Sequence, residues 1–289
     1  MMSILRQIIK GTVLCTALVA LPLTAETVII KGSDTLGAKL IPLLAESFRA
    51  EKASTLSNIS FEIAAEGSST GIASIIEGTT DIGMSSRELA PLELSQARAK
   101  KVAIAQIQIA RDSLAVVVHP TNSIDGLSMQ DIENLFCGDI QNWAGVSLQT
   151  GNTSVYVRNS ASGTYRAFSD LALSGRDYGQ EVLSMAGNEQ IAEEIANNTH
   201  SIGYVGFAYA DRLGLKILSI DGIMPQEPDY ALSRPLYFLI NQNNFKKPIA
   251  REFVDFVLSP KGQAIVESVY FLPATAARNT NSFNSESWK

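Results

Sequence analysis

Residues 157–166 read Val-Arg-Asn-Ser-Ala-Ser-Gly-Thr-Tyr-Arg, and this stretch leads from a predicted strand into a predicted helix. Arg158 ends the β-like run 154–157, and the Ser-Gly-Thr of residues 162–164 opens an apolar helical pattern. Backbone N–H groups at a helix start lack partners within the helix and lie at the positive end of its dipole, so they bind anions. A guanidinium beside them adds a planar set of donors that suits oxyanions. The stretch is typical either of an anion site or of an ordinary helix cap with a solvated arginine, because serine and threonine are favoured caps.

Two further segments repeat this arrangement of strand, short hydroxyl-rich loop and helix. Residues 29–36 read Ile-Ile-Lys-Gly-Ser-Asp-Thr-Leu, and residues 61–71 read Phe-Glu-Ile-Ala-Ala-Glu-Gly-Ser-Ser-Thr-Gly. Helices that follow parallel strands begin at the same edge of a sheet, so several of their N-termini can face one ligand. Three such loops favour a shared site for one small oxyanion.

Five short motifs, taken in order, carry a family resemblance. They occupy residues 32–35, 67–71, 80–87, 158–164 and 201–206. In this order they resemble the periplasmic phosphate-binding proteins of phosphate ABC transporters, over the chain from about Glu26 to Pro273. The resemblance implies an α/β protein with the two-lobed type II periplasmic-binding-protein fold. Each lobe would be a mixed sheet flanked by helices, with the ligand in the cleft between the lobes.

The N-terminal residues are typical of a secretory signal. Arg6 and Lys10 precede a short apolar run at residues 12–23, and Ala25 offers a small residue for cleavage. The run is shorter than the roughly 20 residues that a membrane-spanning helix needs. Lipid attachment at Cys15 is disfavoured because Leu14 stands where a small residue is needed. We therefore expect residues 1–25 to be a signal peptide and the protein to be periplasmic or exported.

Charge and composition exclude several classes of partner. The formal net charge of −6 becomes −8 without residues 1–25, which hold two basic residues and no acidic one. An acidic exterior argues against nucleic acid as a partner. His119, His200 and Cys137, the histidines and cysteine left after cleavage, fall short of metal-ligand spacing. We expect no cofactor and no metal, a monomer, and a buried Cys137.

Two predicted strand crossings divide the chain into lobes. Residues 104–110 alternate as a half-buried strand, and residues 114–119 form an apolar run typical of a strand covered on both faces. Residues 236–240 predict the return. Lobe 1 would hold residues 26–112 and 236–289, and lobe 2 residues 113–235. Such proteins close on their ligand by hinge motion.

The resemblance also implies which residues bind the ligand. In the first loop it points to Ser33, Thr35 and the Leu36 amide, in the second to Ser68, and in the third to Arg158, Ser162, Gly163 and Thr164. Phosphate in a dry cleft needs donors to replace its water, and hydroxyl groups donate or accept as required. Arg158 would supply the countercharge.

One position departs from the family pattern. Members commonly have an aspartate shortly after the Asp-Ile-Gly of residues 81–83, where it accepts the proton of hydrogen phosphate, but here Ser86 and Arg87 follow. Asp34 either replaces this acceptor or is a cap facing water. Asp81 is more typical of a turn behind the site, although it is the next candidate for the acceptor. Arg87 is either a second anion ligand or an inter-lobe salt bridge.

An enzyme is the alternative from another class. Residues 67–71 match the G-x-S-x-G nucleophile elbow of hydrolases, with Ser69 as nucleophile and His200 as a formal base. The parallel loops at Ser33 and Ser162 have no place in a hydrolase. The sequence therefore predicts a non-enzymatic receptor that captures inorganic phosphate and delivers it to a membrane ABC permease. Alternatives are a receptor for sulfate, molybdate or tungstate, a phosphate sensor or scavenger, and the serine hydrolase.

Overall fold

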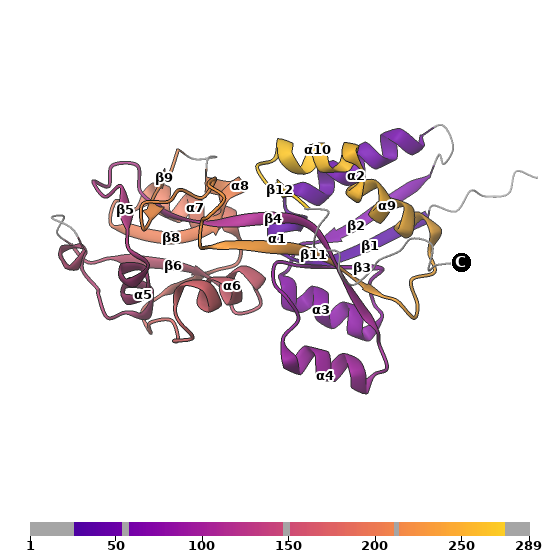
Figure 1. Ribbon diagram of the computed structural model, residues 1–289, viewed down its shortest axis with the longest axis horizontal. Helices are drawn as coiled ribbons and strands as arrows, with labels where there is room; N and C mark the ends of the chain where they lie inside the picture. Colours follow the sequence, from indigo (N-terminus) through magenta and orange to yellow (C-terminus); the bar gives the residue numbers. More distant parts are fainter. Residues whose placement is uncertain (1–25, 54–57, 147–150, 211–213, 275–289) are drawn as a thin grey trace, which may run out of the picture.

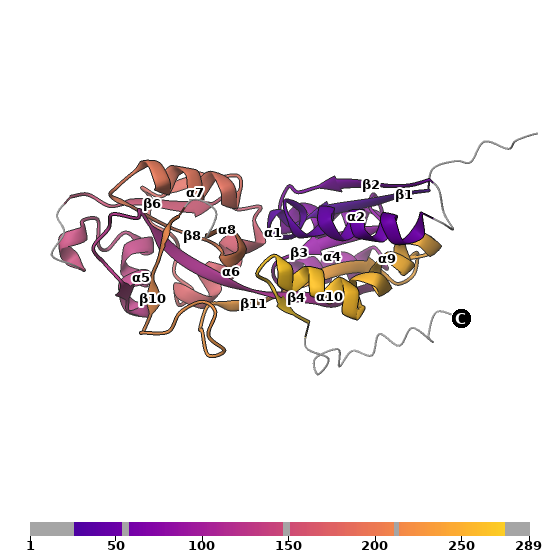
Figure 2. The same cartoon turned by 90° about the horizontal axis from the view of Figure 1, so that it is seen from above.

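The molecule is elongated, with two α/β lobes side by side (Figure 1, Figure 2). The computed structural model describes residues 26–53, 58–146, 151–210 and 214–274. The predicted signal peptide and Cys15 lie outside these residues. Among the residues described, no helix is both long and apolar enough to cross a membrane.

The sheet of the first lobe is mixed. β1 (Glu26–Gly32) pairs in parallel with β2 (Ile59–Ala64) and with β3 (Ile82–Ser85). β11 (Ser233–Asn241) is antiparallel to β3 and to β4 (Ile104–Val118). Because β1, β2 and β3 are parallel, the loops that follow them gather at one edge of this sheet.

The long strand β4 belongs to both lobes. Up to Ser113 it pairs with β11, and from Leu114 to Val118 it pairs with β8 (Ser201–Gly206). The sequence had predicted two separate strands, at residues 104–110 and 114–119. The structure has one strand of 15 residues, in which Asp112 is buried against an arginine of β11.

The second lobe continues from β4 as another mixed sheet. β8 is antiparallel to β4 and parallel to β6 (Ser154–Arg158), which pairs in parallel with β7 (Leu183–Met185). Short strands complete the fold: β9 (Lys216–Ile217) and β12 (Leu272–Pro273) pair with β4, and β5 (Gly126–Leu127) pairs with β10 (Ser219–Ile220).

Helices cover both faces of each sheet (Figure 1). In the first lobe α2 (Leu40–Lys52), α9 (Pro248–Leu258) and α10 (Pro260–Ser268) cover one face, and α3 (Ser68–Glu77) and α4 (Pro91–Ala99) the other. In the second lobe α7 (Asn188–Asn197) and α8 (Phe207–Ala210) lie opposite α5 (Met129–Cys137) and α6 (Gly163–Ala172). The predicted two-lobed α/β fold is confirmed.

The core extends across the two lobes on one face. Phe48 and Phe253 of the first lobe and Ile191 of α7 belong to one buried cluster, which continues along β4 through Val117. Burial of such apolar surface is the main force that stabilises a fold. Cys137 is only half-buried at the end of α5, where partial burial raises the pKa of its thiol.

Candidate functional site

The first of the three loops turns sharply after β1. Gly32 has φ of 134°, and a Cβ there would lie 3.0 Å from the backbone nitrogen of Met84, so the tight turn favours glycine. The Ser33 amide donates to the Met84 carbonyl at 3.0 Å, and the Ser33 side chain caps the four-residue helix α1 (Asp34–Gly37). The turn thereby buries Thr35 and Leu36 at the sheet edge.

The second loop meets the first through serine hydroxyls. Ser68 is the first residue of α3, and its Oγ accepts from the Ser86 amide at 2.9 Å. The hydroxyls of Ser33 and Ser86 are in hydrogen-bond contact. All three serines are buried. Their contacts bring these predicted site residues together at the ends of β1, β2 and β3.

The third loop belongs to the second lobe and ends at the N-terminus of α6. The Ser162 Oγ accepts from the Thr164 amide at 3.1 Å and from the Tyr165 amide at 3.4 Å, as an N-cap does. A Cβ on Gly163 would lie 2.7 Å from the Cβ of Ser68 and 3.3 Å from that of Ser86. Only a glycine lets this helix end approach the first lobe so closely.

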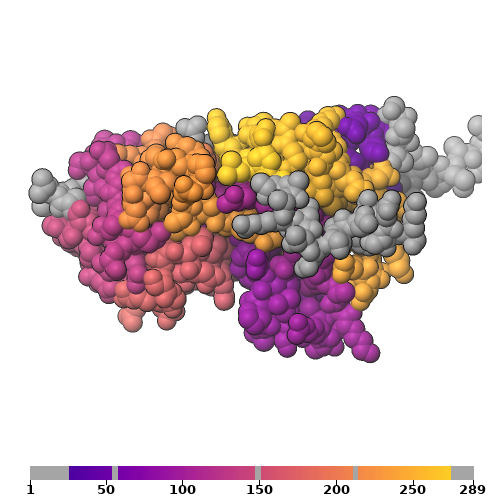
Figure 3. Space-filling view, in the orientation of Figure 1, coloured from indigo at the N-terminus to yellow at the C-terminus, as the bar shows by residue number. Residues whose placement is uncertain are grey.

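The two lobes touch directly at these loops. On the face seen in Figure 3 the second lobe also lies against the first. The hydroxyls of Thr35 and Thr164 lie 3.1 Å apart, and the Ser69 amide donates to the Ala161 carbonyl at 3.2 Å. An oxyanion that enters here would exchange these contacts for contacts with its own oxygens. The arrangement therefore offers donors from both lobes.

Arg158 ends β6 and is 1% exposed. Its Nη1 lies 3.1 Å from the Asp34 Oδ2, across the lobes, and its Nη2 donates to the Ala186 carbonyl at 2.8 Å. Burial lowers the pKa of Arg158, and the charge of Asp34 opposes this effect. Within the described residues its Nε has no hydrogen-bond partner. A buried cation with an unused donor is suited to an anion ligand.

Asp34 does not face water as a cap. Its carboxylate is 15% exposed and accepts from the Asn188 amide at 3.2 Å and from the Asn188 Nδ2 at 2.8 Å. Asn188 begins α7 in the second lobe, and its Oδ1 accepts from the Gly206 amide. Asp34 thus links the first lobe to both β6 and α7, which sequence reasoning did not foresee.

Arg87 forms an ion pair within the first lobe. Its Nη2 lies 2.7 Å from the Glu93 Oε1, and its Nη1 donates to the Glu93 Oε2 at 2.8 Å. Burial alone would raise the pKa of Glu93. The hydrogen bonds from Arg87 and from the Ala90 amide outweigh this effect, so the pKa is lowered. The salt bridge is therefore not the inter-lobe one that the sequence had offered as an alternative.

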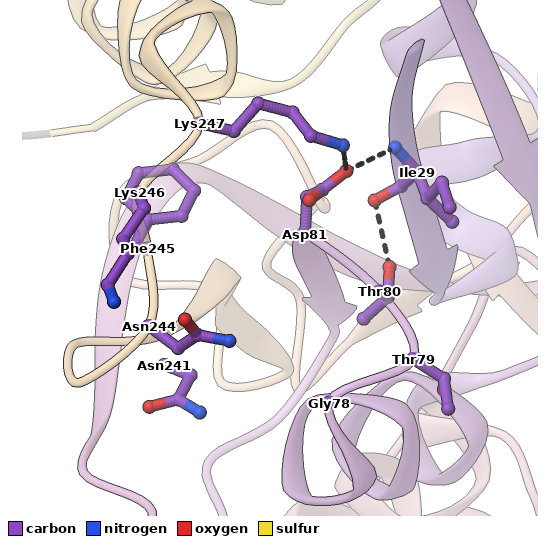
Figure 4. A pocket seen from close by; sticks show the side chains of 10 residues that line it. All are labelled: Ile29, Gly78, Thr79, Thr80, Asp81, Asn241, Asn244, Phe245, Lys246 and Lys247. Atoms are coloured by element: carbon purple, nitrogen blue, oxygen red, sulfur yellow. Dashed lines mark hydrogen bonds and ion pairs between the residues drawn. The ribbon is translucent and has the colours of Figure 1, made fainter.

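Asp81 immediately precedes β3 and Ser86 immediately follows it, so the two residues lie at opposite ends of this strand. The Asp81 Oδ2 accepts from the Ile29 amide at 2.8 Å and from the Lys247 Nζ at 2.6 Å (Figure 4). It lines a polar pocket of about 350 Å³ together with residues of the loop between β11 and α9. Asp81 therefore cannot contact a ligand bound at Ser86. This position agrees with the expectation that Asp81 belongs to a turn behind the site.

Sequence reasoning missed Arg234 and Asp112, which lie beside the first loop. The Arg234 Nη2 lies 2.8 Å from the Asp112 Oδ2 and donates to the Thr35 Oγ1 at 3.3 Å. The signal that could have found them is a charged residue inside an otherwise apolar strand, which is rarely buried without a partner.

The surroundings of Ser69 do not resemble those of a hydrolase nucleophile. Its Oγ accepts from the Arg87 Nη2 at 3.2 Å. His119 follows the end of β4, and His200 precedes β8, at the end of the second sheet away from Arg158. A serine nucleophile needs a base within hydrogen-bond reach, and these histidines lie elsewhere.

Comparison with known proteins identifies the family. A family model described as a PBP superfamily domain matches residues 20–261. The phosphate-binding protein PstS of Pseudomonas aeruginosa is 31% identical over 272 residues, covering 85% of this chain and 82% of that protein. The PstS of Borreliella burgdorferi is 29% identical over 263 residues, covering 86% and 90%.

The solved structures agree with the sequence relatives. A protein from Clostridium perfringens, assigned as a phosphate ABC transporter substrate-binding protein and solved with bound phosphate, aligns with a TM-score of 0.77 at 27% identity. The alignment covers 86% of this chain and 100% of that one. The chain belongs to the PBP superfamily and, within it, to the family of the phosphate-binding protein PstS.

Proposed function

We propose that this protein is an exported receptor that captures inorganic phosphate between its two lobes and delivers it to a membrane ABC permease. The observation that carries the proposal is the buried Arg158 beside the N-terminus of α6, which faces the hydroxyl-rich loops of the first lobe. The PstS relatives and the phosphate-bound Clostridium structure support phosphate as the anion.

The proposed ligand set draws on both lobes. It comprises Ser33, Thr35, the Leu36 amide, Ser68 and Ser86 from the first lobe, and Arg158, Ser162, Gly163 and Thr164 from the second. Hydroxyl and amide groups replace the hydration of phosphate, and Arg158 supplies charge. Arg87 would act indirectly, because its guanidinium is engaged by Glu93 but also holds the Ser69 hydroxyl beside the second loop.

Asp34 has two possible tasks in this site. Its Oδ2 holds Arg158 and Asn188, whereas none of the residues that the structure describes donates to Oδ1, which could accept the proton of hydrogen phosphate. We propose that it serves both, in place of the aspartate that the family commonly has near Ser86.

The arrangement of the chain follows from the same proposal. Lobe 1 would hold residues 26–112 and 236–289 and lobe 2 residues 113–235, with ligand-driven closure between them. The mature protein would be a non-enzymatic monomer without metal or cofactor, released after cleavage near Ala25.

Calorimetric titration of the purified protein, stripped of bound anions, tests the function. Separate titrations with phosphate, sulfate and molybdate are run on wild type and on Arg176→Ala, which alters a surface arginine paired with Asp139 and Glu133. We expect phosphate to bind most tightly to both proteins. Tighter binding of sulfate or molybdate would make the protein a receptor for that oxyanion, and no binding of any would overturn the proposal.

A further inference from the structure

Arg234 and Asp112 form a buried ion pair on the two strands that join the lobes. Arg234 is 3% exposed and lies in β11, and Asp112 is 1% exposed and lies in β4. Besides the 2.8 Å contact from Nη2, the Arg234 Nε donates to the same Asp112 Oδ2 at 3.3 Å. Asp112 lies two residues before Leu114, where β4 begins to pair with β8 instead of β11. The pair therefore lies at the crossing between the lobes.

The guanidinium of Arg234 also reaches the proposed ligand loops. Its Nη2 donates to the Thr35 Oγ1 at 3.3 Å, and its Nη1 lies 3.5 Å from the Ser86 carbonyl oxygen. Thr35 in turn meets Thr164 of the other lobe. Arg234 is thus one hydrogen bond away from the place where the two lobes touch, and its guanidinium contacts both the first loop and the segment that follows β3.

Two buried cations reach the first loop from different elements. Arg158, at the end of β6, pairs with Asp34, and Arg234, in β11, donates to the adjacent Thr35, so both guanidiniums contact consecutive residues of this loop. Each has one carboxylate partner, Asp34 for Arg158 and Asp112 for Arg234. Like charges repel strongly where water is excluded, and an anion between them relieves that repulsion.

We propose that Arg234 is a second cationic ligand of the anion, carried on the strands that join the lobes and oriented by Asp112. This inference rests on the proposed function, because it assigns a further anion-binding residue to the same site. The rival role is structural: Arg234 would only neutralise the buried Asp112. Both roles predict damage when Arg234 alone is changed, since an unpaired carboxylate would remain buried.

A double substitution separates the two roles. Arg234→Gln removes the cation, and Asp112→Asn added to it removes the orphaned charge, so the double variant keeps a neutral, hydrogen-bonding pair in the core. Phosphate is titrated calorimetrically into stripped wild type, Arg234→Gln, the double variant and Arg176→Gln as a surface control. Thermal melting without phosphate confirms that each is folded.

We expect the double variant to bind phosphate at least tenfold more weakly than wild type, with Arg234→Gln equally weak and the control unchanged. A loss smaller than tenfold in the double variant overturns the inference, because Arg234 would then matter only as the partner of Asp112. Failure of wild type to bind phosphate would instead reject the proposed function itself. If wild type binds phosphate, the outcome for the double variant concerns Arg234 alone.

Discussion

Arg158 combines burial, an incomplete set of hydrogen bonds and a carboxylate partner from the other lobe. Arg158→Ala should weaken phosphate binding by about 2–5 kcal/mol, because a buried anion would lose its charged partner. Calorimetric titration measures this loss, and Arg176→Ala serves as the surface control. Wild-type affinity in the Arg158 variant would remove this residue from the site.

Asp34 is expected to govern the choice between phosphate and sulfate. Asp34→Asn keeps an oxygen that can accept from Asn188 but removes the charge that accepts the ligand proton and repels an unprotonated oxyanion. The ratio of phosphate to sulfate affinity should therefore fall, as competition titrations can measure. If both affinities change by the same factor, Asp34 only orients Arg158, and selectivity is set elsewhere.

Residue roles were predictable from the sequence only where they depend on local patterns. Ser162 could be recognised as a cap because the helix pattern follows it directly, and its two amide partners lie within three residues. Asp34 and Arg158 are 124 positions apart, and Asp112 and Arg234 are 122 apart. No local sequence pattern therefore predicts either ion pair. Only the folded chain brings these charges together.

At the level of elements, the start of α4 depends on Glu93. This residue pairs with Arg87 and accepts from the Ala90 amide at 2.7 Å, and its pKa is lowered in the folded protein. A carboxylate with a lowered folded pKa adds stability above its unfolded pKa of about 4.3, and that stability is lost as the pH falls through the folded pKa.

Glu93→Gln should therefore lower the free energy of unfolding at pH 7 by about 1 kcal/mol, since the ion pair is only partly shielded from water. Urea unfolding at pH 7 and near pH 3 measures the difference, which should shrink at the lower pH. Glu77→Gln, in an exposed pair with Lys100, is the control and should change little. An equal loss at both pH values would show that the ionised carboxylate is not responsible.

Elements with a clear period were predicted well, and those fixed by distant partners were not. The strand predicted at residues 154–157 and the helix predicted after residues 162–164 are observed as β6 and α6. Short strands such as β7 and β12 have two or three residues each and depend on a neighbour for their pairing. The sequence did not predict that β4 is continuous, because a charged residue such as Asp112 is unfavourable inside a buried strand unless it has a partner. Its partner, Arg234, is far away in the sequence.

For the whole molecule, the two-lobed fold was predictable because the order of strands, loops and helices reflects its topology. The direct contact between lobes was not, since it depends on close approach at Gly163 and on Asp34 reaching the second lobe. The shared cluster along β4 ties the lobes together away from the ligand loops. Because β4 and β11 carry the chain between the lobes, we expect any motion between the lobes to bend these two strands.

We expect phosphate to bind between the lobes and to draw them together. Small-angle X-ray scattering of the stripped protein, with and without saturating phosphate, measures this change. A ligand that contacts both lobes stabilises the closed state at the expense of open ones, so the radius of gyration should fall on addition of phosphate. An unchanged radius of gyration, under conditions where calorimetry shows the protein saturated, would contradict binding between the lobes.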